Sequence, residues 1–462
     1  MRFCDVGFMG STVVQTPHLD GLAAQAVVFD HVFSSSPICG PARGTLLTGQ
    51  YPVTHGAYAN DVALPSDGPA LGEAFARMGY RTGLIGKWHL AWPPREPGFV
   101  PPGPERKGFQ FWAAHECDHD YRGGHYFMDT PEPIPFRRYA PKEETDIAID
   151  FMRSTTDQPF LLMLNFGIPH MPIPNHQQTE EEYRALYAAA DIPLRPNVPE
   201  HARDRATAYL RHYYGMITVL DDQVGRLLAA LDALGIADDT IVCFCADHGD
   251  MLGSHGLIGL QLPWDECVRV PFVVRWPARV PRARRVSTFV NLADLLPTLL
   301  SLCGTAPARH PAGIQGHDHA GVILGADDAG PDTVFLSDTF PCHQRYGHEP
   351  WRAVRTRRWL YARYPDRTWL LYDMLDDPYQ LRNLRDSAEH QSARGELEGV
   401  LNAWLTRLDD SFPDRERLEQ DLRKHDPRKL DSVRMAWGQP RSHPPYLMPP
   451  IPAQVAEAVS FS

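Results

Sequence analysis

Long hydrophobic runs are absent from this 462-residue sequence. No apolar stretch approaches the ~18 residues that a membrane-spanning helix needs. The first ten residues, MRFCDVGFMG, contain no basic segment followed by an apolar one, so no secretory signal peptide is visible. From the sequence as written we therefore expect a cytoplasmic protein with no membrane partner.

Basic residues are fewer than acidic residues. The chain has 45 Lys and Arg residues against 57 Asp and Glu residues, which gives a formal net charge of −12. A nucleic-acid-binding protein normally presents a basic face, so this balance argues against a nucleic-acid partner. It does not exclude an anionic substrate, because a local cationic pocket can outweigh the field of the whole molecule.

Cysteine is too sparse for a disulfide scaffold, with 8 residues in the whole chain and no C-x-x-C pair at zinc spacing. Cys243 and Cys245 alternate within an apolar run, a pattern that indicates packing inside a buried strand. Internal repeats and low-complexity tracts are missing too. The 43% hydrophobic and 22% charged content is that of an ordinary globular protein.

Short apolar runs alternate with amphipathic stretches, and this order predicts an α/β fold with a largely parallel sheet covered by helices. Helical spacing of apolar residues predicts a long helix over Thr207–Gly235 and another over Asn291–Cys303, the latter kinked at Pro297. The predicted strands are Tyr80–Gly86, Pro159–Phe166, Thr240–Ala246 and Val270–Trp276.

The pattern changes near residue 330, where short strands separated by turn residues begin. These are Thr333–Ser337, Trp351–Arg355 and Trp359–Tyr364, and an amphipathic helix follows over 395–408. We therefore divide the chain into a catalytic domain (1–330), a smaller α+β subdomain with an antiparallel sheet (331–410) and a charged, Pro-rich tail (411–462). The tail is predicted to lie along the surface or to form an arm in a homo-oligomer.

The segment Ser34–Gly49 (SSSPICGPARGTLLTG) carries the strongest chemical signal. Cys39 follows a β-like run and a proline, and it precedes a stretch of good helix formers. This places Cys39 at a helix N-terminus, where backbone N–H groups and the helix dipole favour an anion. Arg43 lies one helical turn further on and can reach the same point. The alternative is a buried cysteine beside a capping turn.

Polar residues also follow three of the predicted strands. Lys87 and His89 come after the first, His170 after the second, and Asp247 and His248 after the third. In open α/β sheets, ligands bind at the carboxyl ends of the strands. We therefore expect one Lys, three His and one Asp to meet at one edge of the sheet.

Taken together, these motifs resemble those of the type I, formylglycine-dependent sulfatases of the alkaline-phosphatase-like superfamily. The similarity covers about residues 1–410. The matching segments are Thr16–Asp20 (TPHLD), Cys39–Arg43 (CGPAR) with Thr48–Gly49, Gly86–Leu90 (GKWHL), Pro169–Pro172 (PHMP), Asp247–Asp250 (DHGD), and Leu371–Asp373 (LYD) with Asp377–Pro378 and Asn383–Leu384.

The resemblance implies an alkaline-phosphatase-like α/β/α sandwich with a large mixed, mostly parallel sheet. It also implies that a formylglycine-generating enzyme oxidises Cys39 to formylglycine, whose hydrate attacks a small-molecule or saccharide sulfate ester. Arg43 and Lys87 would supply the fixed positive charge that the transition state needs. His170 would be the general acid, and His89 would take a proton from the hydrate.

The resemblance further implies one divalent cation, Ca²⁺ in the first place and otherwise Mg²⁺ or Mn²⁺. Its ligands would be Asp247, His248 and the residue-39 oxygen. In the family, a strand ending in paired carboxylates precedes the segment that Met1 begins here, and no such strand precedes Met1. We expect the upstream codons to encode an apolar strand of about six residues that ends in Asp-Asp. Asp5 is expected to cap or pack locally.

A second departure from the family pattern is Leu260, which stands where the family usually has a sulfate-contacting Lys. The chain therefore has one cationic donor fewer than an ordinary arylsulfatase. Sulfate-monoester hydrolysis is the leading prediction. A phosphonate monoester or phosphodiester hydrolase of the same superfamily remains an alternative, as does a non-catalytic anion-binding relative with an incomplete metal site.

Overall fold

The computed structural model describes residues 1–60, 62–91, 98–155, 157–170, 179–280, 282–326, 330–341, 349–414, 416–418 and 420. Its helices are α1 (Pro17–Ala23), α2 (Cys39–Thr48), α3 (Pro52–His55), α4 (Leu71–Arg77), α5 (Ala140–Arg153), α6 (Glu181–Tyr187), α7 (Arg203–Ala233), α8 (Asp265–Val268), α9 (Leu295–Leu302), α10 (Ala320–Leu324) and α11 (Gln391–Leu408). Its strands are β1 (Val27–Phe33), β2 (Arg81–Lys87), β3 (Phe111–His115), β4 (His125–Tyr126), β5 (Ile134–Pro135), β6 (Phe160–Asn165), β7 (Val242–Cys245), β8 (Phe272–Arg275), β9 (Arg284–Asn291), β10 (Thr333–Asp338), β11 (Trp351–Thr356), β12 (Trp359–Arg363) and β13 (Thr368–Asp373).

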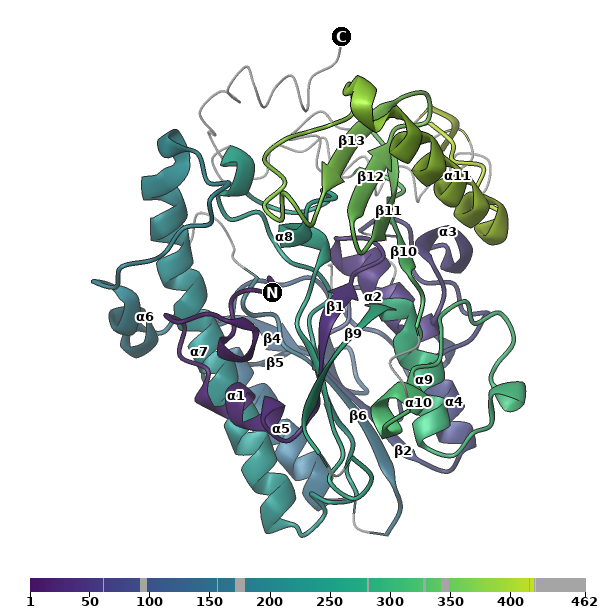
Figure 1. Cartoon of the computed structure of the whole chain (residues 1–462). Helices are drawn as coiled ribbons and strands as arrows, with labels where there is room; N and C mark the ends of the chain where they lie inside the picture. Colours follow the sequence, from purple (N-terminus) through teal and green to yellow (C-terminus); the bar gives the residue numbers. More distant parts are fainter. Residues whose placement is uncertain are drawn as a thin grey trace.

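The large domain is a three-layer sandwich. Helices α1, α5 and α7 cover one face of the central strands, and α2, α4, α9 and α10 cover the other (Figure 1). Apolar side chains from both helical layers pack on the strands, as a fully covered sheet requires. The α/β/α architecture expected from the sequence is confirmed.

The central strands form two sheets where the sequence predicted one large sheet. One has the order β3-β2-β6 with parallel pairing throughout. The other has the order β7-β8-β1-β9, in which β8 runs antiparallel to both of its neighbours and β1 is parallel to β9. β6 and β7 are each the edge strand of their sheet, and both strands line the same cavity.

The four predicted strands of the large domain all form, with ends that differ by one or two residues from the expected ones. The predicted long helix is α7, and it begins four residues earlier than expected. The predicted kink at Pro297 is wrong. Residues Leu292–Asp294 form a separate 3₁₀ turn, and Pro297 lies in the first turn of α9, where its missing N–H breaks no helical hydrogen bond.

The smaller subdomain contains the antiparallel sheet β10-β11-β12-β13 and the helix α11. The sequence predicted the first three strands and the helix but not β13. Leu401 and Trp404 of α11 pack against Phe335 of β10 and Tyr361 of β12 in one apolar cluster, which Tyr51 of the large domain joins. The subdomain is thus docked on the catalytic domain. Most of the predicted tail, from 421 onward, lies outside the described residues.

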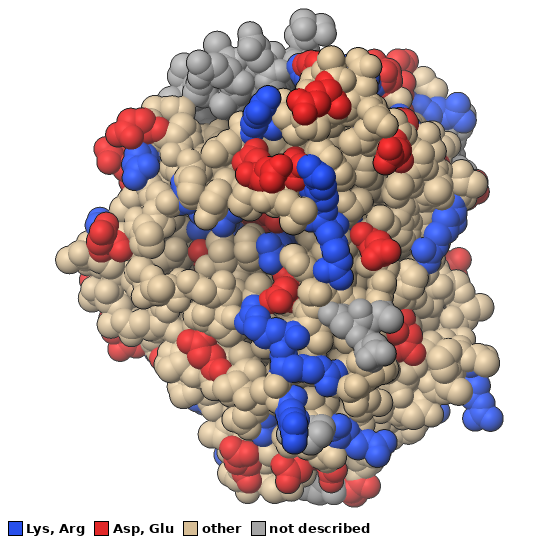
Figure 2. All heavy atoms as spheres, viewed as in Figure 1, with Lys and Arg blue, Asp and Glu red and all other residues tan. Residues whose placement is uncertain are grey.

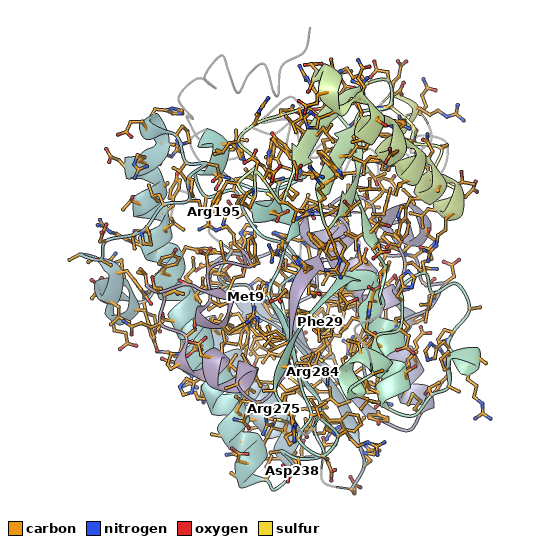
Figure 3. The ribbon with its side chains drawn as sticks, viewed as in Figure 1. Met9, Phe29, Arg195, Asp238, Arg275 and Arg284 are labelled. Atoms are coloured by element: carbon orange, nitrogen blue, oxygen red, sulfur yellow. The ribbon has the colours of Figure 1, made fainter. Side chains whose placement is uncertain are left out.

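Charged side chains are unevenly spread over the viewed surface. Basic residues gather in a column down the middle of this face, with acidic residues around it (Figure 2). Arg275 at the end of β8 and Arg284 at the start of β9 both lie along the middle of the face (Figure 3). The protein therefore has local positive regions on its surface although its net charge is negative. None of the described helices combines the length and the apolar character that crossing a membrane would need.

Candidate active site

Cys39 is the first residue of α2. The preceding residue, Ile38, is extended, with φ −153° and ψ 143°, so the helix starts abruptly where β1 and its following loop end. Asn60 accepts a hydrogen bond from the backbone N–H of Gly40 at 2.8 Å and pins this first turn. The Cys39 side chain is 2% exposed. The prediction of a cysteine at a helix N-terminus is confirmed.

The other predicted residues lie at or just after the carboxyl ends of three strands, close to Cys39. Lys87 is the last residue of β2, and His170 follows β6 after a short turn. Asp247 and His248 directly follow β7, and the rings of His170 and His248 lie 6.1 Å apart. The expectation that separate strands converge on one edge is met, because these residues surround Cys39.

Three side chains contact the Cys39 sulfur. Nε2 of His248 lies 3.1 Å from Sγ, and Nζ of Lys87 donates to Sγ at 3.4 Å. His170 forms a further hydrogen bond to the thiol. Burial by itself raises the pKa of Cys39, but Lys87, His248 and the bond from His170 outweigh it and bring this pKa well below 9.0. The pocket thus favours negative charge at the side chain of residue 39.

Arg43 and Lys87 hold their positions through different contacts. Arg43 pairs with Asp247 at 3.1 Å and donates to the backbone carbonyl of Lys87 at 2.9 Å. Burial lowers the pKa of Lys87, but the charge interactions with Cys117 and Cys39 raise it by more. The net pKa lies above its ordinary value of 10.5, so Lys87 stays protonated. Burial likewise opposes ionisation of Asp247, yet His248 and Arg43 lower its pKa to about 2. The site is a network of fixed charges.

His89 lies two residues after Lys87, in a left-handed backbone conformation with φ 59°, and is buried. Its neighbour is Cys117, which the sequence did not single out. Burial raises the pKa of Cys117, but His89, Lys87 and His119 lower it well below 9.0. The His119 ring stacks on the His170 ring with centroids 4.2 Å apart.

Cys117 and His119 follow β3, a strand that the sequence analysis did not predict. The only signal in the sequence was the polar cluster HECDH directly after the four apolar residues FWAA. These residues extend the site beyond the predicted set. They add a thiol and an imidazole next to the predicted general acid.

The candidate metal ligands do meet. Donor atoms of Cys39, Asp247 and His248 all lie within 4.8 Å of one another. Ca²⁺ takes about six to eight oxygen ligands, and this cluster offers one carboxylate, one imidazole and one residue-39 atom. The Asp247 carboxylate is also bound by Arg43. These three side chains are a partial set, and by themselves they do not fit a Ca²⁺ coordination shell.

Met1 lies beside this cluster. Its amino group donates to the backbone carbonyl of His248, and its side chain is buried at 8% exposure. Asp5 forms a buried ion pair with Arg2 and accepts a hydrogen bond from Tyr214 at 3.3 Å. The prediction that Asp5 has a local packing role is confirmed.

Leu260 does not enter the site. It is 9% exposed and belongs to an apolar cluster that includes Ile38 and Met251. The loop continues into Gln261, whose backbone N–H donates to the carbonyl of Pro37 at 3.0 Å. Position 260 therefore supplies no cation to the site. Cationic contacts near residue 39 come from Arg43 and Lys87 among the described residues.

Comparisons with known proteins agree with this geometry. Residues 1–305 match the family model described as Sulfatase, and residues 253–406 match the model of the N-sulphoglucosamine sulphohydrolase C-terminal region. An ulvan-active sulfatase from Formosa agariphila is 35% identical over 90% of this chain and 81% of its own length. An endo-4-O-sulfatase from Bacteroides thetaiotaomicron is 27% identical over 88% of each chain.

A solved structure from Bacteroides fragilis that carries the sulfatase name YidJ superposes with a TM-score of 0.80. It is 26% identical and covers 89% of this chain and 94% of its own. Sulfatases of this family share a formylglycine nucleophile and a divalent metal ion. The chain belongs to the sulfatase family and is a sulfuric ester hydrolase.

Proposed function

We propose that this sulfatase cleaves a sulfate monoester carried by a saccharide, with residue 39 as the nucleophile after its conversion to formylglycine. The observation that carries this proposal is the environment of the residue-39 side chain. It lies at the start of α2, is buried, and is contacted by Lys87, His248 and His170. In the family, the hydrate of formylglycine supplies the attacking oxygen.

The charged residues of the site suit a sulfate-ester transition state, in which negative charge spreads over several oxygens. Lys87 and Arg43 provide two cations whose positions are fixed before substrate binds, which is the most effective form of electrostatic stabilisation. His170 donates a proton to the leaving alcohol, and its stacking on His119 holds the ring in place. His89 accepts a proton as sulfate is released.

Ca²⁺ is the ion that we propose for the metal site, with Asp247, His248 and residue 39 as part of its ligand set, the further oxygen ligands coming from outside these three side chains. Metal removal with a chelator should abolish activity, and re-addition of Ca²⁺ should restore more of it than Mg²⁺ or Mn²⁺. Recovery with Mg²⁺ or Mn²⁺ but not with Ca²⁺ would contradict the choice of ion. Maturation further requires a formylglycine-generating enzyme as a partner during expression.

The saccharide is proposed because relatives of similar length are named for such substrates. They include the ulvan-active sulfatase from Formosa agariphila and an N-acetylglucosamine-6-O-sulfatase from Bacteroides thetaiotaomicron. His119, which is partly exposed and stacks on the His170 ring, is a polar aromatic group suited to contact with a sugar.

The test measures sulfate release from sulfated saccharides, an aryl sulfate and choline sulfate, and product release from a phosphonate monoester. We expect the matured protein to favour a sulfated saccharide, Cys39→Ala to lose this activity, and Cys4→Ala to keep it, because Cys4 lies outside the site. Retained activity in Cys39→Ala would overturn the assignment of the nucleophile. Preference for the phosphonate would overturn the assignment of the substrate.

A further inference from the structure

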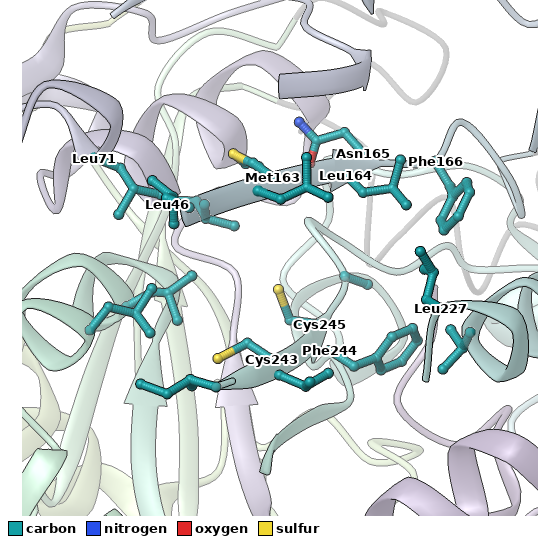
Figure 4. A pocket seen from close by; sticks show the side chains of 18 of the residues that line it. Leu46, Leu71, Met163, Leu164, Asn165, Phe166, Leu227, Cys243, Phe244 and Cys245 are labelled. Carbon is teal, nitrogen blue, oxygen red and sulfur yellow. The ribbon is translucent and has the colours of Figure 1, made fainter. Parts of the chain in front are cut away.

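The proposed general acid, His170, lies outside the regular elements of the fold. β6 ends at Asn165, and Figure 4 shows Asn165 and Phe166 at the end of this strand, beside the cavity that β6 and β7 line. The chain then turns over residues 167–170, where the backbone N–H of His170 donates to the carbonyl of Gly167 at 3.2 Å. This distance is at the long end of the range for N–H···O bonds, so the turn needs support from other contacts.

The hydroxyl of Tyr121 contacts both ends of this turn. Its oxygen lies 2.9 Å from the carbonyl oxygen of Gly167 and 2.9 Å from the carbonyl oxygen of His170, and it can donate to either. Tyr121 is 3% exposed, and its own backbone carbonyl accepts from the N–H of Ala140, the first residue of α5, at 2.8 Å. The turn is therefore tied to a buried side chain whose backbone is itself anchored to a helix.

Gly167 permits this close approach. A Cβ atom at position 167 would lie 2.5 Å from Cε1 of Tyr121, which is closer than real side chains pack. Any other residue at this position would push the Tyr121 ring away from the turn. A glycine is thus needed where the backbone passes directly over the aromatic ring.

The same hydroxyl also contacts the His119 ring. Nδ1 of His119 lies 3.3 Å from the Tyr121 oxygen, and Nε2 lies 3.5 Å from Sγ of Cys117. The face of this ring stacks on His170, with centroids 4.2 Å apart and planes 12° from parallel. Tyr121 therefore acts on His170 by two routes, through the backbone of its turn and through the ring stacked against it.

The charge state of His119 suits this stack. Burial and the neighbouring His170 lower the pKa of His119 to about 4, although Cys117 has the opposite effect. His119 is accordingly neutral near pH 7. The stack then places no second positive charge against a protonated His170.

We propose that Tyr121 is a positioning residue for the general acid: its hydroxyl holds the turn at residues 167–170 and the His119 ring, and so keeps the His170 imidazole aimed at the leaving oxygen. This inference rests on the proposed function, in which His170 is the acid. As the oxygen of residue 39 bonds to sulfur, the bond from sulfur to the leaving oxygen breaks. The leaving oxygen keeps the electron pair and takes the proton of His170.

The test compares Tyr121→Phe with the wild type on two substrates that differ in their need for the acid. A sugar alcohol is a poor leaving group and needs protonation, whereas a nitrophenol leaves readily without it. We expect kcat for a sulfated saccharide to fall by about 10–10², the scale for a misplaced catalytic group. For nitrophenyl sulfate we expect a fall of less than about threefold.

Tyr139→Phe is the matched control. Tyr139 is buried next to Tyr121, with ring centroids 6.4 Å apart, and its hydroxyl has no hydrogen-bond partner among the described residues. This variant removes a hydroxyl from the same cluster without altering the turn. It should leave kcat unchanged on both substrates. An equal fall in kcat on both substrates in Tyr121→Phe, or a rise in KM alone, would overturn the proposal.

A double-mutant cycle shows whether Tyr121 acts through His170. In a His170→Asn background, Tyr121→Phe should change the rate on the saccharide by less than about twofold, because the group that it positions is gone. An undiminished loss in that background would overturn the proposal.

His119→Leu gives a second measurement at a partly exposed position, where folding does not depend on the side chain. It should lower kcat for the saccharide and leave kcat for nitrophenyl sulfate within about threefold of the wild type. Equal changes on the two substrates would again overturn the proposal. If the matured wild type releases sulfate from neither substrate, the proposed function fails and this inference fails with it. Loss of selectivity between the substrates in the variants refutes the inference alone.

Discussion

At the residue scale, two cations stand beside the side chain that the family uses as its nucleophile. Lys87 contacts the Cys39 sulfur, and Arg43 is held by Asp247 and by the backbone carbonyl of Lys87. Because these positions are fixed by burial and hydrogen bonds, little reorganisation is needed when charge develops on the sulfate. The same residues are therefore expected to matter more for the chemical step than for substrate binding.

Lys87→Ala and Arg43→Ala should each lower kcat by about 10²–10³, which is the scale for removal of one preorganised donor. Steady-state kinetics on the sulfated substrate would measure this. Arg77→Ala is the matched control, because Arg77 is an exposed residue paired only with Glu73 on the surface of α4. A rise in KM with unchanged kcat would show that the two cations bind only the ground state.

The thiol of Cys39 offers a second prediction at this scale, in protein produced without maturation. Lys87, His248 and His170 lower its pKa below 9.0 against the effect of burial, so the thiolate should persist at lower pH than in an ordinary cysteine. The rate of alkylation of Cys39 as a function of pH would report this, and Lys87→Ala should move the profile upward. A midpoint at or above 9.0 in the unmodified protein would contradict the described electrostatics.

At the scale of elements, polar residues that directly follow strongly apolar runs could be predicted from the sequence. Lys87, His170 and His248 all have this context. Cys117 and His119 were not predicted as site residues, because the strand before them, β3, is short. Its sequence FWAAH is followed directly by polar residues, with no turn signal to mark the end of a strand. Strand β9 was not predicted for a related reason. Its sequence RRVSTFVN begins with two charged residues, and it is buried mainly in its second half.

A buried ion pair between Arg195 and Glu266 connects the segment before α7 to α8. The two side chains lie 2.7 Å apart, and Asn197 donates to the same carboxylate at 2.7 Å. Burial alone would raise the pKa of Glu266, but Arg195, His255 and the Asn197 bond lower it from 4.5 to about 2. A lowered carboxylate pKa stabilises the fold above pH 4.5, and the contribution is lost as pH falls from 4.5 toward 2.

Glu266→Gln should therefore lower the free energy of unfolding by about 3 kcal/mol at neutral pH. The difference from the wild type should shrink as the pH falls below 4.5. Urea unfolding at several pH values would measure both effects. Glu200→Gln is the control, because its pair with Arg203 is on the surface and should contribute less than about 1 kcal/mol. A difference that is the same at every pH would contradict the role of this ion pair.

Helix α11 is docked through a small number of apolar residues, and Leu401 is fully buried among them. Leu401→Ala should lower the free energy of unfolding by about 2–5 kcal/mol, since it removes buried methyl groups and leaves a cavity. Glu396→Ala, at an exposed position of the same helix, should change it by less than about 0.5 kcal/mol. Equal effects of the two variants in chemical unfolding would show that α11 is not packed as described.

At the scale of the whole molecule, the alternation of strands and helices was sufficient to predict a largely parallel sheet covered by helices, and the change of pattern near residue 330 predicted the separate antiparallel subdomain. The α/β/α sandwich was implied by the resemblance to the sulfatase family. The division of the central sheet at β6 and β7 could not be read from their sequences, because both are apolar runs typical of central strands. Pairing of such strands depends on neighbours that are distant in the sequence. Only the structure shows that each of the two has an edge without a neighbouring strand in the described part of the chain.

The identity of the side chain at residue 39 in the active enzyme is the central claim, and one mass spectrum tests it. Trypsin cleaves after Arg2 and Arg43 and releases residues 3–43, a peptide that contains both Cys4 and Cys39. In protein that releases sulfate from its substrate, we expect formylglycine at position 39 and an unmodified thiol at position 4. Two intact thiols in a fully active preparation would contradict the account.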